Sequence, residues 1–358
     1  MSTMDFKQTI GRRIEDYRKK EGMSQADLAQ KMEGLSKSSI EKFEKGEMAP
    51  SPQNLKRLAE VLNVMEEDLV RPYILEIDYD VIRYRKRSKL PKKVIAAIQR
   101  KYGIMLERYI EIEMIMEDRV LFPFDYSDMP VSSPQDARRV ARRFRSDMGW
   151  DDRPIVAPIC QLEKKGVKVF TLDPTESENK DFDGMCYREG NLAVVVVKKC
   201  ENTEHDRFTL FHEMGHLLMN TGDIQGRELE RLCHAFASEM LIPENRFKVL
   251  FPKGRIYRDT LKMIQREWGI SCDAQLYKAR DLGMITKNNF ISYCVQKNRS
   301  SSLKQEMEQS RFEAEQGCRF ETLVMQAWQD FRVTGAKAAS LLGCTLDELN
   351  IKYQSVNG

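Results

Sequence analysis

The chain of 358 residues has no C-x-x-C pair, no apolar run long enough to cross a membrane, and only four histidines. Its eight cysteines are spaced singly, a pattern that fits neither a disulfide framework nor a cysteine zinc site and is typical of reduced thiols. The longest apolar run, residues 192–197, predicts a buried strand. The polar N-terminus lacks the apolar core of a signal peptide. We therefore expect a cytoplasmic protein with no membrane partner.

The chain also lacks an excess of either charge. Its formal net charge is +3, which is too small to indicate nucleic-acid binding, so such a function must rest on local patches. Hydrophobic residues make up 41% of the chain, enough for sizeable cores. The length predicts two or three compact units.

Periodicity and helix caps divide the chain into four segments. Residues 1–72 predict short helices, with Ser24 and Ser36 as N-caps and a loop around Pro50 and Pro52. Residues 73–145 predict a basic helical connector with a long helix from Lys92 to about Glu117. Residues 146–300 predict mixed α/β structure, and residues 301–358 are expected to be helical. The strands are expected at 166–172 and 192–199, with a loop over 173–184.

Two of the four histidines stand in the stretch FTLFHEMGHLLMN, residues 208–220. In a helix, His212 and His216 lie on one face, and their imidazoles can reach one cation at about 2.0–2.1 Å each. Glu213, one step round the helix, can act as a general base. Because this five-residue motif also occurs by chance, its context matters. The apolar flanks predict a buried helix. Burying two histidines there without a binding partner would cost free energy. His205 is expected to be structural or solvated.

A second helix over 227–244 can return beside the first and offers Glu230 as a third ligand. Two histidines and a glutamate with an open position form an established catalytic zinc site, although manganese or iron would also fit. Glu228 is expected to point elsewhere, and Glu239 to be a surface or helix-pairing residue. His234, one turn beyond Glu230, could be a ligand, an orienting partner of a ligand, or a donor to the oxyanion; we favour the orienting role.

The stretch FTLFHEMGHLLMN followed by ELERLCHAFASEMLIP resembles the ImmA/IrrE family of metallopeptidases. Members typically show FTLAHELGH and then E-x-x-A-N-x-F-A-x-x-L-L-M-P. Glu230 matches the glutamate ligand of the family, and Phe236, Ala237 and Pro243 match its packing positions. The resemblance covers most of residues 80–350. It implies an α+β zincin-like fold, with a small sheet and the HExxH helix, that holds Zn²⁺.

This chain departs from the family at three positions near the motif. Cys233 and His234 stand where members usually have alanine and asparagine, and Asn220 replaces a frequent histidine. The resemblance implies Glu213 as the catalytic base, to which we add His234 as a candidate catalytic residue. Family members cleave DNA-binding repressors in a regulated way, so it also implies a specific protein substrate.

The segment SQADLAQKMEGLSKSSIEKFEKGEMAPSPQNLKRLAEVLNV resembles the XRE (Cro-like) helix-turn-helix family, over residues 10–70. Gln25 and Ala26 open its second helix, and Ala29 is the small residue where two helices cross. The resemblance implies that the helix after the turn enters a major groove. The expected groove contacts are Lys37, Ser38, Ser39 and Lys42, and the expected phosphate contacts are Gln25 and Lys45.

A small helical protein-interaction domain is the alternative for this segment. Residues 1–72 hold thirteen basic and thirteen acidic side chains, so the domain is not basic overall. Glu41 and Glu44 would repel phosphates, although the basic run 83–101 could add contacts. We favour DNA binding, and a two-fold operator would require a homodimer.

Together these patterns predict a multidomain protein: an all-α helix-turn-helix domain, a basic connector, a zincin-like metallopeptidase domain and a helical C-terminal segment. We expect a DNA-binding transcriptional regulator fused to a zinc endopeptidase, of the phage, mobile-element or toxin–antitoxin type. Its partners would be double-stranded operator DNA, for example its own promoter, and a protein encoded nearby. The substrate could be a repressor, a toxin, or its own linker at 71–92. The alternative is a repressor or antitoxin whose metal domain is only structural or sensing; Glu213 favours the enzyme.

Overall fold

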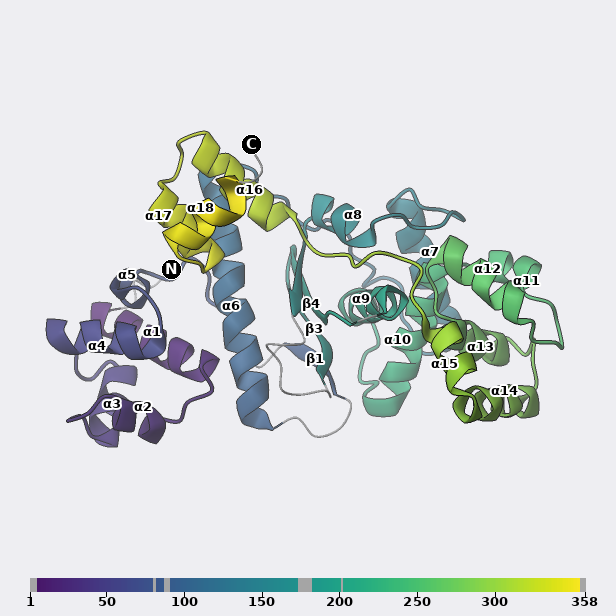
Figure 1. The fold of residues 1–358 in the computed structure, drawn as a ribbon, viewed down its shortest axis with the longest axis horizontal. Coiled ribbons are helices and arrows are strands. Elements are labelled where there is room, and N and C mark those ends of the chain that lie inside the picture. The colour runs from purple at the N-terminus through teal and green to yellow at the C-terminus, as the bar shows by residue number, and fades with distance from the viewer. Residues whose placement is uncertain (1–4, 80–81, 87–90, 173–181, 201, 355–358) are drawn as a thin grey trace. The chain divides into compact units, whose positions relative to one another are not determined.

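The computed structural model describes residues 5–79, 82–86, 91–172, 182–200 and 202–354 (Figure 1). The chain forms two compact units, and neither is continuous in sequence. The first unit comprises residues 1–81, 88–119 and 320–358, and the second comprises residues 82–87 and 120–319. None of the described helices is long and apolar enough to span a membrane.

The described residues of the first unit contain helices and no strands, as the sequence predicts for its N-terminal and C-terminal parts. Its helices are α1 (Phe6–Lys20), α2 (Gln25–Lys31), α3 (Lys37–Glu44), α4 (Pro52–Leu62), α5 (Glu66–Val70), α6 (Lys92–Ile115), α16 (Arg319–Gln329), α17 (Gly335–Leu342) and α18 (Leu346–Gln354). The long helix expected from Lys92 is therefore present and ends close to the expected residue.

Side-chain caps set the boundaries of the short helices. The Ser24 hydroxyl accepts a hydrogen bond from the Asp27 amide while the Asp27 carboxylate accepts one from Ser24, a capping box that starts α2. Ser36 caps α3, as expected: its hydroxyl accepts a hydrogen bond from the Ser39 amide. Pro52, which was expected in a loop, is instead the first residue of α4, because Ser51 provides the cap and proline suits this position.

Close packing of α1 against α3 requires a glycine that the sequence did not single out. A Cβ on Gly11 would collide with the backbone carbonyl of Phe43 and crowd that of Glu44. The apolar core of these helices includes Ile14, Leu28 and Leu58, each fully buried. We expect Gly11→Ala to disrupt this crossing because backbone atoms cannot move aside as a flexible side chain can.

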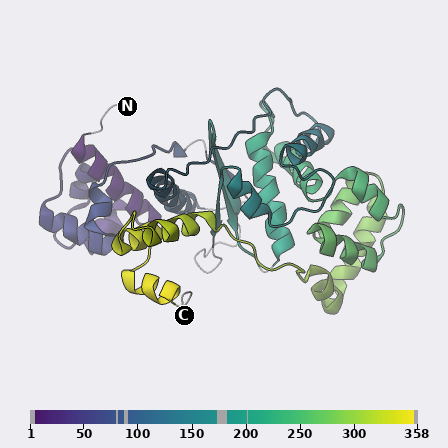
Figure 2. The same cartoon turned by 90° about the horizontal axis from the view of Figure 1, so that it is seen from above.

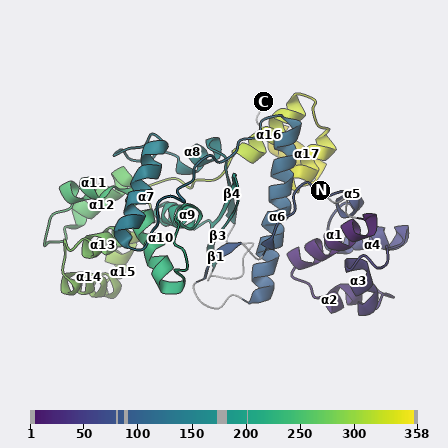
Figure 3. The ribbon, with the colours of Figure 1, turned by 180° about the vertical axis from the view of Figure 1, so that it is seen from behind.

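Helix α6 packs against α1 and is not a solvated connector. The Arg13 guanidinium donates to both carboxylate oxygens of Glu107 at 2.5 and 2.7 Å, and both side chains are buried. Arg100, part of the basic run at 83–101, pairs with Asp16 of α1 at 2.9 Å. The C-terminal helices join the same unit, and Figure 3 shows α16 and α17 beside α6. Lys337 of α17 pairs with Glu111 of α6 at 2.6 Å.

The second unit contains a four-stranded sheet in the order β1-β3-β4-β2. Its strands are β1 (Arg83–Lys86), β2 (Val167–Leu172), β3 (Phe182–Glu189) and β4 (Leu192–Lys198). β2 and β4 are parallel, whereas β3 is antiparallel to β4 and β1 is antiparallel to β3. The sequence predicted β2 and β4 but missed β1 and β3. Part of the expected loop, residues 182–184, opens β3, and 173–181 lie outside the described residues.

Nine helices complete the described part of the second unit. They are α7 (Pro134–Asp147), α8 (Pro158–Lys164), α9 (Thr203–Leu218), α10 (Gly226–Leu241), α11 (Glu244–Leu250), α12 (Arg258–Trp268), α13 (Cys272–Asp281), α14 (Lys287–Arg299) and α15 (Ser301–Glu308). α9 packs on β3 and β4, α10 packs on α9, and α7 packs on α10 (Figures 1 and 2). One apolar core joins Val195 and Val197 of the sheet to Phe211 and Met214 of α9 and Phe236 of α10.

The architecture is therefore an all-α N-terminal domain, an α+β domain built on a small sheet, and a helical C-terminus, which confirms the predicted fold class. In the α+β domain the sheet supports α9 from one side and α10 packs on it from another. This arrangement fixes the residues on the facing surfaces of the two helices.

Candidate functional site

The candidate metal centre lies between α9 and α10, which come close together at Gly215. A Cβ on Gly215 would meet the Phe236 ring at 3.3 Å, so a larger residue here would require the Phe236 side chain to shift by a few tenths of an ångström. Asn202 caps α9 by accepting a hydrogen bond from the His205 amide at 2.9 Å. His205 is half-buried in the first turn of α9 and belongs to none of the metal-donor groups found among the described residues.

The structure brings His212, His216 and Glu230 together, in agreement with the spacing of the motif. The Nε2 atom of His212 lies 3.2 Å from one carboxylate oxygen of Glu230, and the Nε2 atom of His216 lies 3.4 Å from the other. The two histidine side chains are 0% and 6% exposed, whereas that of Glu230 is 36% exposed. The three donors therefore converge on one point with one open side.

Electrostatics keep the Glu230 carboxylate ionised. Burial alone would raise the pKa of Glu230, but hydrogen bonds and charge interactions with His212 and His216 outweigh burial and lower it well below its usual range. Two imidazole nitrogens and an ionised carboxylate form a donor set that suits zinc and other borderline divalent cations. The residues present therefore fit a metal ion of this class.

Glu213 is fully buried on α9, on the side that faces the sheet. A Cβ built on Gly184 of β3 would lie 3.0 Å from both the Cγ and one carboxylate oxygen of Glu213. The backbone of β3 therefore passes directly beside this carboxylate, and only a glycine leaves room for it. The sequence identified Glu213 but did not connect it with Gly184, because their contact joins segments that are far apart in the chain.

Cys233 supports one of the candidate ligands. Its sulfur lies 3.5 Å from Nδ1 of His216, and the side chain is fully buried. If Nε2 of His216 carries the lone pair that binds a metal, Nδ1 holds the proton and donates it toward the sulfur. The sequence singled out Cys233 as a departure from the family pattern, and the structure places it where it orients His216.

His234 lies beside the same donors but on the exposed side of α10. Its ring centroid is 4.9 Å from that of His212 and 5.7 Å from that of Phe208. His212, Glu230 and His234 also form a group whose donor atoms all lie within 4.8 Å of one another. His234 is thus placed at the open side of the centre, where a substrate would approach.

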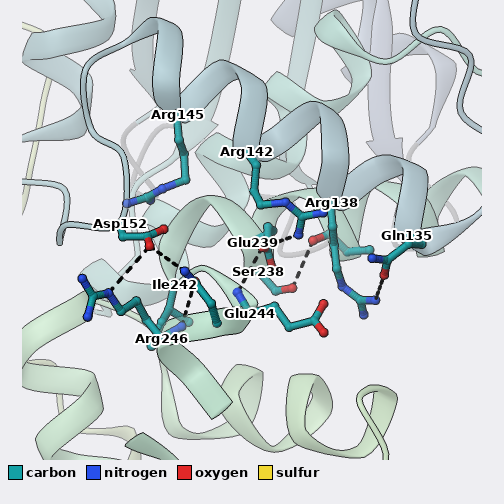
Figure 4. A network of polar contacts seen from close by, with 12 residues as sticks. Gln135, Arg138, Arg142, Arg145, Asp152, Ser238, Glu239, Ile242, Glu244 and Arg246 are labelled. Atoms are coloured by element: carbon teal, nitrogen blue, oxygen red, sulfur yellow. Dashed lines mark hydrogen bonds and ion pairs between the residues drawn. The ribbon is translucent and has the colours of Figure 1, made fainter. Parts of the chain in front are cut away.

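The two alternative glutamates lie away from the donors. Glu228 is exposed in the first turn of α10. Glu239 is completely buried and pairs with Arg142 of α7 at 2.9 Å (Figure 4). It also pairs with Lys278 of α13 at 2.7 Å. The expectation that Glu239 lies on the surface is therefore wrong. The other expected role, that of a helix-pairing residue, agrees with its contacts to α7 and α13. Burial alone would raise the pKa of Glu239, but Lys278 and Arg142 lower it.

A second donor group lies elsewhere in the α+β domain. The sulfurs of Cys160 and Cys318 are 3.7 Å apart, and Glu163 lies with them. The Glu163 carboxylate accepts hydrogen bonds from the backbone amides of Cys318 and Arg319 at 3.1 and 3.3 Å. The sequence argued against a cysteine zinc site because the cysteines are spaced singly, with no C-x-x-C pair. This group is therefore the natural control for any metal measurement.

The candidate nucleic-acid interface is the outer surface of α3. Lys37, Ser38 and Lys42 are exposed, and Ser39 is half-buried with its hydroxyl 3.0 Å from that of Ser36. Ile40 and Phe43 point into the core. The helix therefore presents two lysines and a serine on one exposed surface, as a helix that enters a major groove requires.

Two acidic residues on or near α3 were expected to repel phosphates. In the structure, each of them forms an ion pair with a basic side chain. Glu44 is buried and accepts hydrogen bonds from the Arg18 guanidinium at 2.5 and 2.9 Å. Glu41 pairs with Lys45 at 2.8 Å. The Gln25 amide also donates to Glu44, at 2.8 Å, so this side chain is already engaged within the domain.

Lys37→Ala and Lys42→Ala are each expected to weaken binding to the DNA upstream of the gene that encodes this chain. Each substitution also removes one positive charge from the surface that faces the DNA, so it should reduce the salt dependence of log K by up to about one unit. A mobility-shift titration at several salt concentrations measures both effects. Lys56→Ala, which removes an exposed lysine on α4, serves as the control. Equal affinity of all three variants and the wild-type chain would contradict the assignment of α3.

Comparison with known families agrees with both domains. Residues 14–69 match the helix-turn-helix family, and residues 162–280 match the IrrE N-terminal-like domain family. The chain thus combines an XRE-type helix-turn-helix region with an IrrE-like region of the M78 peptidase family, which confirms the two resemblances drawn from its motifs. No curated protein matches the chain.

Proposed function

We propose that this protein is a DNA-binding transcriptional regulator with a zinc-dependent endopeptidase domain that cleaves one specific regulatory protein. The observation that carries the proposal is the convergence of His212, His216 and Glu230 beside the buried Glu213. Two imidazoles and a carboxylate leave an open position for substrate, which distinguishes catalytic zinc sites from closed structural ones.

In this proposal His212, His216 and Glu230 hold the metal ion. When bound, zinc acts as a Lewis acid that polarises the scissile peptide carbonyl. Glu213 accepts a proton from the attacking water as the new C–O bond forms. It then delivers that proton to the amide nitrogen as the C–N bond breaks, so that the leaving group departs as a neutral amine. The sequence favoured an orienting role for His234, but its exposed position at the open side suits a different one: it donates a hydrogen bond to the oxyanion.

The alternative is a regulator or antitoxin in which the metal domain is a structural or sensing module. Such a site would need the three ligands and their supporting partner Cys233, but it would not need Glu213. A fully buried carboxylate next to metal ligands has a desolvation cost, and general-base catalysis gives a reason for it. The burial of Glu213 therefore favours the peptidase.

The helix-turn-helix domain supplies the proposed regulatory context. We propose that it binds an operator in double-stranded DNA as a homodimer, through α3. The substrate would be a repressor or toxin encoded nearby, or the linker of the chain itself, as in phage, mobile-element or toxin–antitoxin systems. A soluble regulator of this kind would act in the cytoplasm.

Glu213→Gln is expected to abolish cleavage while it preserves the fold and the bound metal. The zinc-loaded full-length chain is added to an extract of the cells that encode it, and new protein N-termini are identified by mass spectrometry. N-termini that appear with the wild-type chain should be absent with the Glu213→Gln variant. If both proteins give the same N-termini, or if neither gives any, the structural or sensing alternative replaces the peptidase.

A further inference from the structure

The sheet of the α+β domain is extended by a strand from outside the region that matches the peptidase family. β2, β3 and β4 all lie within residues 162–280. Within this set, β3 is the outer strand on the side of β1. β1, residues 83–86, comes from the segment that follows the helix-turn-helix domain, and it belongs to the same compact unit as the peptidase region. The outer edge of β3 is therefore paired with a segment from a different part of the chain.

This edge lies next to the proposed catalytic base. Gly184 of β3 is so close to Glu213 that a Cβ would lie 3.0 Å from its carboxylate. In the register of the sheet, Arg85 of β1 is directly opposite Gly184, and Tyr84 is opposite Met185. Neighbouring strands are about 4.7–4.9 Å apart, so the main chain of β1 runs one strand spacing from the backbone that touches Glu213.

Extended peptides commonly bind proteins by adding a strand to a sheet edge, with main-chain hydrogen bonds for affinity. We propose that β1 is a displaceable internal occupant of the outer edge of β3, where an extended peptide would otherwise pair beside the active site. The ligand class is an extended peptide in antiparallel register, because this is how β1 itself pairs with β3. The inference rests on the proposed function, because the edge serves substrate binding only if the domain is a peptidase. Its test measures peptide binding alone and does not require catalysis.

The pairing between β1 and β3 is short and irregular, so β1 can be displaced from the edge of β3. β1 has four residues, and its register with β3 shifts between Arg85 and Lys86. So short a strand contributes few inter-strand hydrogen bonds, and the net stabilisation from each one is modest because the same groups can bind water instead. A longer extended segment of a protein substrate can pair with more of β3 and replace it. The covalent link gives β1 a high effective concentration, so a weakly binding peptide does not compete.

The test uses two full-length variants in a Glu213→Gln background, so that no cleavage interferes. The double substitution Tyr84→Pro/Arg85→Pro removes two consecutive backbone amide donors. Consecutive amides of a strand point to opposite sides, so one of the two removed amides must be the one that faces β3. The second variant replaces residues 83–86 with Gly-Ser-Gly-Ser. The probe is a fluorescent peptide with the sequence VIRYRKRS, residues 81–88, and its control carries proline at both central positions.

We expect both variants to bind the probe at least tenfold more tightly than the parent chain does, as measured by fluorescence anisotropy, and none of the proteins to bind the proline-containing control. Circular dichroism checks that the variants are folded. Equal binding by the parent and both folded variants, or no binding by any of them, would overturn the inference. The probe measures binding and not catalysis, so the two proposals can fail separately. If the variants bind the probe as expected but the wild-type chain produces no new protein N-termini in the cell extract, the peptidase is rejected and the peptide-binding edge is retained.

Discussion

His216→Ala is expected to weaken zinc binding by more than about 100-fold, since even the loss of a residue that only supports a ligand typically costs about 10–100-fold. The substitution removes one of the three donors that converge at the centre and leaves Glu230 with a single imidazole partner, His212. A chelator competition titration gives the affinity. Metal analysis of the purified wild-type chain should find close to one zinc ion per chain.

Thermal unfolding provides an independent measure of the same loss. A metal that binds only the folded state stabilises it by an amount that grows with ligand concentration over Kd. Added zinc should therefore raise the melting temperature of the wild-type chain and have little effect on His216→Ala. The control is Cys160→Ser/Cys318→Ser, which removes the other donor group and should retain the metal. If this control loses the zinc and His216→Ala retains it, the metal belongs to the cysteine group instead.

The helices of this protein could be predicted well from sequence because their signals are local. Ser24 and Ser36 accept hydrogen bonds from amides three residues ahead, so each cap can be recognised within one short stretch. The i, i+4 spacing of His212 and His216 likewise depends only on the helix. Glu230 could be proposed as a third donor because a second helix follows at a distance that allows it to return antiparallel.

The missed strands had no such local signal. β1 has the sequence RYRK, and β3 begins with Phe-Asp-Gly, so neither shows the apolar alternation or β-branched composition of β2 and β4. They are strands because β4 offers an edge to β3 and β3 offers an edge to β1. Tertiary pairing, rather than intrinsic propensity, determines their structure.

The partners of the buried polar residues in the α+β domain could not be predicted from the sequence either. Glu239 could have lain on the surface, because helix periodicity does not show that α7 and α13 both bring a cation to it. Gly184 could not be connected with Glu213, since the two are brought together only by the packing of α9 on the sheet. In both cases the sequence identifies the residue but not the partner that determines its role.

Lys278→Met is expected to destabilise the α+β domain by about 3–5 kcal/mol, the usual cost of removing one partner from a buried ion pair. Lys278 and Glu239 are both 0% exposed and lie 2.7 Å apart. The Lys278 ammonium also donates to the backbone carbonyls of Ser238 and Ile242 at 3.2 and 2.8 Å. It thereby ties α13 to the C-terminal end of α10, the helix that carries Glu230.

Chemical unfolding of the full-length chain, followed by a probe in this domain, measures the loss. The matched control is Lys248→Met, which breaks an i, i+4 pair with Glu244 at the surface and should cost less than about 1 kcal/mol. Lys278→Met/Glu239→Leu should recover much of the stability, because two apolar side chains leave no buried charge without its buried partner. Arg142 remains solvated after this change, since its side chain is 41% exposed. If the double variant is less stable than Lys278→Met, Glu239 contributes more through Arg142 and the Glu244 amide than through Lys278.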